Sequence, residues 1–168
     1  IHVACEKPLC FTVEQAEELQ ALAAEKNLFF AVTYTYTGYA MVKLARELVE
    51  KGEIGEIVNV NAEYLQDWLI DEIGGGSQTT TKLSVWRTDP EKSGISNCVG
   101  DIGTHIEDTV SYITGLHPKK VAAALDNYGM ELDLNANMLV EYENGVHGVY
   151  SCSQVCAGHL NGLTVRIF

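Results

Sequence analysis

Two short segments, far apart in the chain, carry side chains that could handle a proton together. Glu6-Lys7-Pro8 closes a short apolar strand and places an ammonium at the carboxyl end of that strand. Asp101, His105 and Asp108 follow at helical spacing, so all three are expected to project from one stripe of a helix. An ammonium and an imidazole that share a pocket could hold a substrate oxygen and exchange its proton. The two segments therefore predict a single proton-handling site.

Other interpretations of the acidic stripe remain open. An aspartate near a helix N-terminus is stabilised by the helix dipole and could simply face solvent. Against this, Ile102, Ile106 and Val110 form the adjacent apolar face, so the stripe borders the core, where a cleft would lie. The same acid, imidazole and acid could instead bind a metal ion in a hydrolase, although no further ligand cluster is visible in the sequence.

The first segment of the chain predicts a βαβ unit of a parallel sheet. A capping box at Thr12–Gln15 begins a helix that runs to about Lys26, with apolar residues such as Leu22 facing inward. The apolar run 28–32 is typical of a strand that is covered on both faces. Ligands of open parallel sheets bind at the carboxyl ends of the strands, which is where Lys7 lies.

The remainder of the chain predicts helices that are combined with a largely antiparallel sheet. Val58 to Tyr64 alternate in polarity, which is typical of a strand with one wet face, and Asn144-Gly145 is a strong hairpin signal. We expect helices at 39–51 and 100–115, and strands at 58–64, 121–125, 134–142 and 146–153. The fold class is α/β to α+β: the end of a Rossmann-type parallel sheet, followed by an α/β domain with an open, mostly antiparallel sheet.

Residues 71–96 are predicted to form a long loop. Its Gly- and Thr-rich part, Gly74–Thr81, is as consistent with disorder as with function. Trp86-Arg87 has two interpretations, a buried tryptophan beside a surface arginine or a pair that faces the substrate.

Composition excludes several classes of partner. The formal charge of −12 disfavours binding to nucleic acid or to an anionic membrane surface, and 46% apolar residues is an ordinary globular balance. The five cysteines form no C-x-x-C pair, which indicates reduced thiols, a cytoplasmic location and no structural zinc. The chain lacks an initiator Met and starts within a strand-like run, so we expect it to be part of a longer protein.

Four motifs in the same order resemble those of the Gfo/Idh/MocA family of nicotinamide-dependent oxidoreductases. The segment around Glu6-Lys7-Pro8 resembles its E-K-P motif, and the polar stretch 33–38 lies where the family leaves its nucleotide domain. Residues 50–57 resemble its G-x-I-G-x-I segment, and residues 100–105 its D-x-G-x-H helix. The resemblance spans nearly the whole chain, but the family's Gly-rich dinucleotide fingerprint is absent. It implies that residues 1–36 end a dinucleotide-binding domain, and that residues 37–168 form a substrate-binding and oligomerisation domain.

The resemblance also assigns roles to individual residues. Lys7, Asp101 and His105 match the family's catalytic lysine and its acid–histidine pair. His105 would accept the proton of a substrate hydroxyl, while Lys7 would hold the reacting oxygen. Candidates for contact with the cofactor are Glu6, Lys7, Pro8 and Tyr36, and those for contact with the substrate are Trp86, Arg87 and Asp108.

The activity implied is hydride transfer between NAD or NADP and a sugar, cyclitol or related polyol. The chain alone is expected to be inactive, and the whole protein to be a homo-oligomer that packs through the open sheet face. Asn59, Asn61, Asn135 and Asn137 leave room for a wet interface there. The alternative is a non-catalytic binding or assembly module that retains the fold, in which Lys7 and His105 would not meet.

Overall fold

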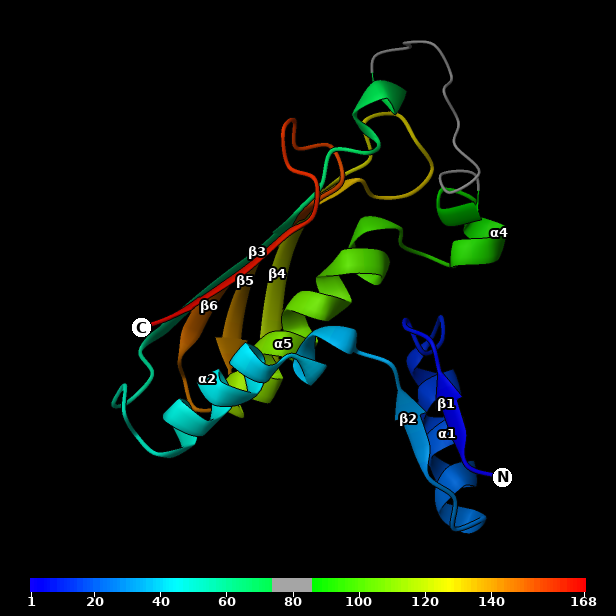
Figure 1. Cartoon of the computed structure of the whole chain (residues 1–168). Coiled ribbons are helices and arrows are strands. Elements are labelled where there is room, and N and C mark those ends of the chain that lie inside the picture. The colour runs from blue at the N-terminus through cyan, green and yellow to red at the C-terminus, as the bar shows by residue number, and fades with distance from the viewer. Residues whose placement is uncertain (74–85) are drawn as a thin grey trace.

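A β-α-β unit forms a small lobe at one side of the molecule (Figure 1). The computed structural model describes residues 1–73 and 86–168. Strand β1 (Val3–Cys5) pairs in parallel with β2 (Phe30–Val32), and helix α1 (Val13–Glu25) connects them. Both hydrogen bonds of the predicted capping box are present, between Thr12 and Gln15. The βαβ prediction is confirmed.

The small lobe buries less of its apolar surface than the sequence predicts. None of the residues of α1 is buried, and the Leu22 side chain, predicted to face inward, is 49% exposed. The run 28–32 is not covered on both faces, since Phe29 is 79% exposed. The reason is geometric, because a sheet of two strands with one helix can cover only one of its faces.

A five-stranded sheet forms the larger lobe. It contains β3 (Asn59–Leu65), β4 (Pro118–Asp126), β5 (Asn135–Tyr142), β6 (His147–Ser153) and β7 (Gly162–Ile167), in the order β4-β5-β6-β3-β7. Three of the pairings are antiparallel, whereas β3 runs parallel to β6. The mostly antiparallel sheet is confirmed, but β3 does not lie in an antiparallel environment on both sides. Gly145 has a φ of 87° in the turn between β5 and β6, as the hairpin signal predicts.

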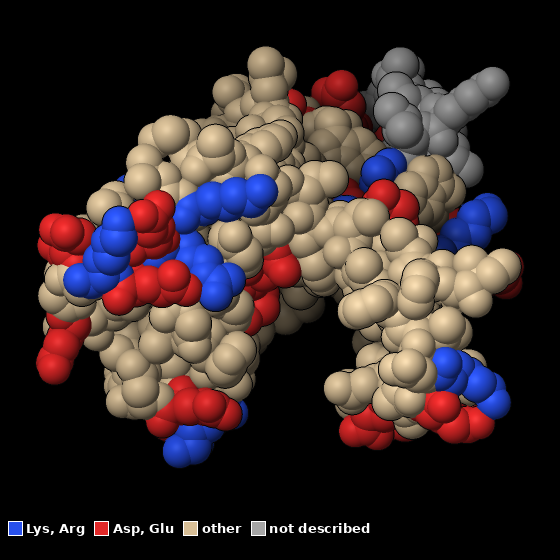
Figure 2. Space-filling model, turned by 60° about the horizontal axis from the view of Figure 1, so that its bottom comes forward, with Lys and Arg blue, Asp and Glu red and all other residues tan. Residues whose placement is uncertain are grey.

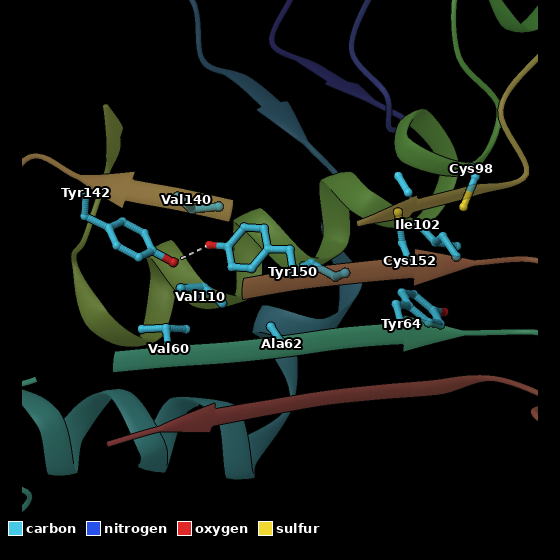
Figure 3. Packing of buried hydrophobic residues seen from close by; sticks show 12 residues of the cluster. Val60, Ala62, Tyr64, Cys98, Ile102, Val110, Val140, Tyr142, Tyr150 and Cys152 are labelled. Atoms are coloured by element: carbon cyan, nitrogen blue, oxygen red, sulfur yellow. Dashed lines mark hydrogen bonds between the residues drawn. The ribbon is translucent and has the colours of Figure 1, made fainter. Parts of the chain in front are cut away.

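Two helices, α2 (Ala40–Glu50) and α5 (Thr104–Thr114), cover one face of this sheet (Figure 1). The core lies between α5 and the inward side chains of β3, β5 and β6 (Figure 3). Val60, Ala62 and Tyr64 are buried as the alternation predicts, but Val58 lies before the strand and is 69% exposed. On α2, the Leu48 side chain is 41% exposed.

The opposite face of the sheet is open. Its exposed apolar side chains include Val121, Leu139 and Val149, which line a shallow hollow. Asn59 and Asn61 of β3 point to this face and are partly exposed. An exposed apolar patch rimmed by polar residues is a common feature of surfaces that bind another protein.

Short helical segments connect these parts of the molecule. They are η1 (Thr35–Gly38), η2 (Ile70–Glu72), α4 (Pro90–Ser93) and the π-helical turn η3 (Val99–Gly103) that leads into α5. Gly74–Thr81, predicted to be part of a long loop, lies outside the described residues. No helix in the described part of the chain is long and apolar enough to cross a membrane.

Candidate active site

Lys7 and Asp101, the two charged residues predicted to share a site, are in direct contact. The Lys7 ammonium donates to the Asp101 carboxylate at 2.7 Å and to the Asp101 backbone carbonyl at 2.6 Å. Both side chains are largely shielded, with 15% and 18% of their surface exposed. Lys7 lies just beyond β1, and its peptide bond to Pro8 is cis. The small lobe and the large lobe therefore meet at this ion pair.

Two more side chains hold the second oxygen of the Asp101 carboxylate. Gln154 donates its amide Nε2 to Oδ2 at 3.0 Å, and Arg87 forms an ion pair with the same oxygen at 3.3 Å. The Arg87 guanidinium also lies over the rings of Trp86, at 4.4 Å, and Trp68, at 6.0 Å. Both oxygens of the Asp101 carboxylate are therefore occupied by hydrogen-bonded or oppositely charged partners.

The local backbone explains why Asp101 projects toward the small lobe. Asp101 lies in η3, whose π-helical turn is wider than a regular helical turn. Asp133 fixes the start of this turn, since its carboxylate accepts from the backbone N–H groups of Asn97 and Val99 at 2.9 and 2.8 Å. A carboxylate at the start of a helical segment satisfies donors that would otherwise be unpaired.

His105 lies in the first turn of α5, beneath three tyrosine rings. The ring centroids of Tyr36, Tyr34 and Tyr64 lie 4.8, 5.8 and 6.2 Å from that of the imidazole. His105 is 7% exposed, and its Nδ1 atom has no hydrogen-bond partner among the described residues. Burial, together with the nearby Lys7 ammonium, lowers the pKa of His105 from 6.5 to about 4, against the opposing effect of Asp101. The imidazole is therefore neutral at pH 7, the form that can accept a proton.

The tyrosines that surround His105 are joined to the rest of the large lobe by hydrogen bonds. The hydroxyl groups of Tyr36 and Tyr64 share a short hydrogen bond, and Tyr64 donates to Asn161 Oδ1 at 2.6 Å. Gln66 donates to the same Asn161 oxygen at 2.8 Å and accepts from the Trp68 indole at 2.8 Å. Burial and the Tyr36 hydroxyl raise the pKa of Tyr64, so the Tyr64 hydroxyl stays protonated.

A cavity of about 450 Å³ lies beside the ion pair, at the junction of the two lobes. Six of the residues that line it are Glu6, Lys7, Pro8, Trp86, Arg87 and Asp101. Figure 2 shows that a deep notch separates the two lobes on the lower side of the molecule. A concave, largely apolar lining with a few convergent charged groups is the usual form of a small-molecule site.

The structure does not bring all of the predicted site residues to this cavity, because His105 and Asp108 are not among the described residues that line it. Trp86 is 44% exposed while Arg87 is more shielded, so the interpretation as a buried tryptophan with a surface arginine is wrong. Asp108 lines a different hollow, of about 510 Å³, together with Tyr34 and Glu107. The π-helical turn interrupts the regular spacing, so Asp101 and Asp108 do not face one pocket. Burial and the Glu107 charge raise the pKa of Asp108 to about 6.

The remaining predicted residues lie around the ion pair. Glu6 accepts a hydrogen bond from the Thr33 hydroxyl at 2.8 Å, which links the ends of β1 and β2. Pro8 lines the cavity, whereas Tyr36 packs on His105 away from it. Within residues 1–73 and 86–168, no group of three or more His, Cys, Asp or Glu side chains is arranged to hold a metal ion.

For three residues near the site, no sequence pattern indicated a role in the site. Gln154, Asn161 and Tyr64 come from segments distant from both motifs, and only the strand order brings them to Asp101 and Tyr36. Tyr64 was predicted as an inward residue of a strand, but nothing in its alternation indicates a hydroxyl partner.

Matches to known protein families cover nearly the whole chain. Residues 42–168 match the GFO/IDH/MocA C-terminal domain, and residues 1–34 match the NAD-binding Rossmann fold of the oxidoreductase family. The uncharacterized oxidoreductase YfiI of Bacillus subtilis is 35% identical, over 99% of this chain and 43% of that protein. Levoglucosan dehydrogenase of Pseudarthrobacter phenanthrenivorans is also 35% identical, over 68% of this chain and 27% of that protein.

The fold comparison agrees with the sequence comparison. An inositol dehydrogenase homolog from Azotobacter vinelandii, solved with NAD+, superposes with a TM-score of 0.92 at 33% identity, covering all of this chain and 43% of that one. Its complex with NADH and myo-inositol gives a TM-score of 0.87 at 31% identity, covering all of this chain and 42% of that one. The chain spans less than half the length of these relatives. With both of its parts matched in order, this chain belongs to the Gfo/Idh/MocA family of oxidoreductases.

Proposed function

We propose that the complete protein is an NAD(P)-dependent dehydrogenase of a sugar, cyclitol or related polyol. The observation that carries this proposal is the contact between Lys7 and Asp101 beside a cavity at the lobe junction. A lysine at the carboxyl end of a parallel strand lies where open α/β sheets bind their ligands. The related proteins include a levoglucosan dehydrogenase and an inositol dehydrogenase homolog solved with myo-inositol, and both names denote polyhydroxylated substrates.

In this proposal Lys7, Asp101 and His105 divide the work on one substrate hydroxyl. Lys7 donates a hydrogen bond to the substrate oxygen, and Asp101 keeps the ammonium in place. His105 accepts the hydroxyl proton as the carbon is oxidised to a carbonyl, which needs the neutral imidazole that burial favours. Trp86 and Arg87 supply an apolar face and a fixed cation to the substrate side of the cavity.

The residues at the end of β1 fit a nicotinamide cofactor. The nicotinamide, when bound, accepts the hydride that leaves the substrate carbon. The Thr33 hydroxyl fixes the Glu6 carboxylate, and Pro8 adds an apolar surface next to Lys7. The end of β1 therefore offers the cofactor both a fixed polar group and an apolar surface. Tyr36 supports His105 from the other side. Domain boundaries at 1–36 and 37–168, and contact of Asp108 with a bound substrate, are part of the same proposal.

Further parts of the proposal concern the state of the protein. This chain alone should not turn over, because its parallel sheet has two strands and its sequence lacks the Gly-rich fingerprint. The apolar open face with Val121, Leu139 and Val149 supports a homo-oligomer. The net charge disfavours nucleic acid and anionic membranes, and the five free cysteines suit the cytoplasm.

The test is hydride transfer by the complete protein. Myo-inositol, levoglucosan and xylose would each be offered with NAD+ or NADP+, and deuterium at the oxidised carbon would be followed into the nicotinamide by mass spectrometry. We expect transfer with at least one of these polyols, and its loss in Asp101→Asn. If no polyol transfers deuterium to either cofactor while the cofactors still bind, the protein is a binding module and the proposal is wrong.

A further inference from the structure

We propose that Gln154, with Asn97 behind it, is a positioning residue that sets the orientation of Asp101. This inference rests on the proposed function, because it explains how one of the three residues in that mechanism is prepared for its role. Neither Gln154 nor Asn97 belongs to a motif, and both are fully shielded, with 0% and 1% of their surface exposed. A buried polar pair is costly unless each member is hydrogen-bonded, so its contacts require an explanation.

Asn97 determines which end of the Gln154 amide faces Asp101. Asn97 Nδ2 donates to Gln154 Oε1 at 2.6 Å, which occupies the carbonyl end of that amide. The Nε2 end is therefore directed at Asp101 Oδ2, to which it donates at 3.0 Å. An amide held in this direction offers Asp101 only a donor. The Nε2 group can donate to a carboxylate oxygen but cannot accept a hydrogen bond from a protonated carboxyl group.

Gln154 is itself fixed by the backbone on both sides. Its N–H donates to the Leu134 carbonyl at 2.9 Å, and its carbonyl accepts from Leu69 N–H at 3.0 Å. These bonds tie the end of β6 to the start of β5 and to the segment after β3. Asn97 is tied in turn to η3, because its carbonyl accepts from Asp101 N–H at 2.8 Å. The amide pair thus braces the Asp101 side chain and backbone against the sheet.

The geometry divides the two Asp101 oxygens between two tasks. Oδ2 is occupied by Gln154 and by the Arg87 ion pair, while Oδ1 remains directed at the Lys7 ammonium. Without Gln154, the carboxylate could rotate toward Arg87 and leave Lys7 with the backbone carbonyl alone. Misplacing a catalytic group by about 1 Å costs roughly 10²-fold in rate. A buried amide pair that holds Asp101 in position can therefore have a large effect on turnover.

The test uses Gln154→Met, which keeps the length of the side chain and removes both hydrogen bonds. In the complete protein, we expect kcat for polyol oxidation to fall roughly 10²-fold, with the KM for NAD(P) changed by less than about threefold. The matched control is Ser153→Ala, which alters the adjacent buried residue of β6 without touching Asp101. Equal losses in both variants at equal melting temperature would assign Gln154 a merely structural role.

A second variant, Gln154→Glu, gives a readout that packing alone would not change. Its new carboxyl group must hold a proton to donate to Asp101, among the charges of Lys7 and Arg87 that face the same site. We expect the turnover of this variant to be close to that of wild type in mild acid and to fall steeply as the pH rises. The pH profile of the wild-type protein should show no such fall. An unchanged pH profile would overturn the inference.

A crystal structure of Gln154→Met separates the two proposals. We expect the Asp101 carboxylate to turn away from the Lys7 ammonium, beyond hydrogen-bond distance. If it stays in place, the positioning role is wrong whatever the kinetics show. If it turns away but the wild-type protein oxidises no polyol, the proposed function fails while the positioning role stands.

Discussion

His105 provides a quantitative test of the buried site, because its charge state is coupled to folding. The pKa of His105 is about 4 in the folded chain and 6.5 when unperturbed. Between these values the unfolded chain binds a proton that the folded chain does not, so stability rises with pH across this window. Each pKa unit corresponds to about 1.4 kcal/mol, so the loss of unfolding free energy below both pKa values is about 3 kcal/mol. At about pH 5 this loss is already about 2 kcal/mol.

The expected result is that wild-type protein loses about 2 kcal/mol more than His105→Gln on going from pH 7 to about pH 5. The free energy of unfolding would be measured with urea at both pH values. The exposed His159 provides the control, since His159→Gln should show the wild-type dependence. The pKa itself can be measured from the imidazole carbon-bound protons by NMR.

Two substitutions separate the causes of the His105 shift. Because the Lys7 charge lowers the pKa of His105, Lys7→Met should raise it. Because the Asp101 charge raises it, Asp101→Asn should lower it further. A wild-type pKa between 6 and 7, or no response to Lys7→Met, would show that His105 is neither buried nor close to the ammonium, and the reasoning would be refuted.

Three further predictions concern stability. Burial raises the pKa of Asp108 to about 6, so ionisation of this carboxyl group opposes folding above that pH. Asp108→Asn should therefore stabilise the protein at pH 7 by about 1 kcal/mol, after allowance for the partial exposure of the side chain. A lower free energy of unfolding in urea would contradict this. A Cβ at Gly148 would lie 2.9 Å from the Val60 carbonyl, so Gly148→Ala should destabilise by about 1–3 kcal/mol in the same assay, whereas Gly38→Ala, which meets nothing within 4 Å, should not. Loss of the capping box in Thr12→Ala should cost about 1 kcal/mol, seen as lower protection of α1 amides in hydrogen exchange, and unchanged protection would count against the cap.

The sequence predicted the elements well where one local signal dominates. The capping box at Thr12, the alternation at Val60, Ala62 and Tyr64, and the Asn144-Gly145 turn each depend on neighbours along the chain, and each is present. Burial was predicted less well where it depends on distant partners. Leu22 lies on an amphipathic helix, but the small lobe offers too little surface to cover it.

The candidate site shows the same division. The contact of Lys7 with Asp101 follows from two motifs that the sequence displays. Gln154 and Asn161 reach the site only through the order β6-β3-β7, and no periodicity along the chain encodes that order. The different positions of Asp101 and Asp108 depend on a π-helical turn, which the regular spacing of a helix does not predict.

Turnover by the complete protein carrying Lys7→Met or His105→Asn tests the central claim most directly. The claim is that the ammonium held by Asp101 and the neutral imidazole of α5 act on the same substrate hydroxyl. It predicts that each substitution lowers kcat for polyol oxidation by roughly 10²–10⁴-fold while the protein remains folded and binds NAD(P). Near wild-type turnover in either folded variant would contradict it and remove that residue from the reaction.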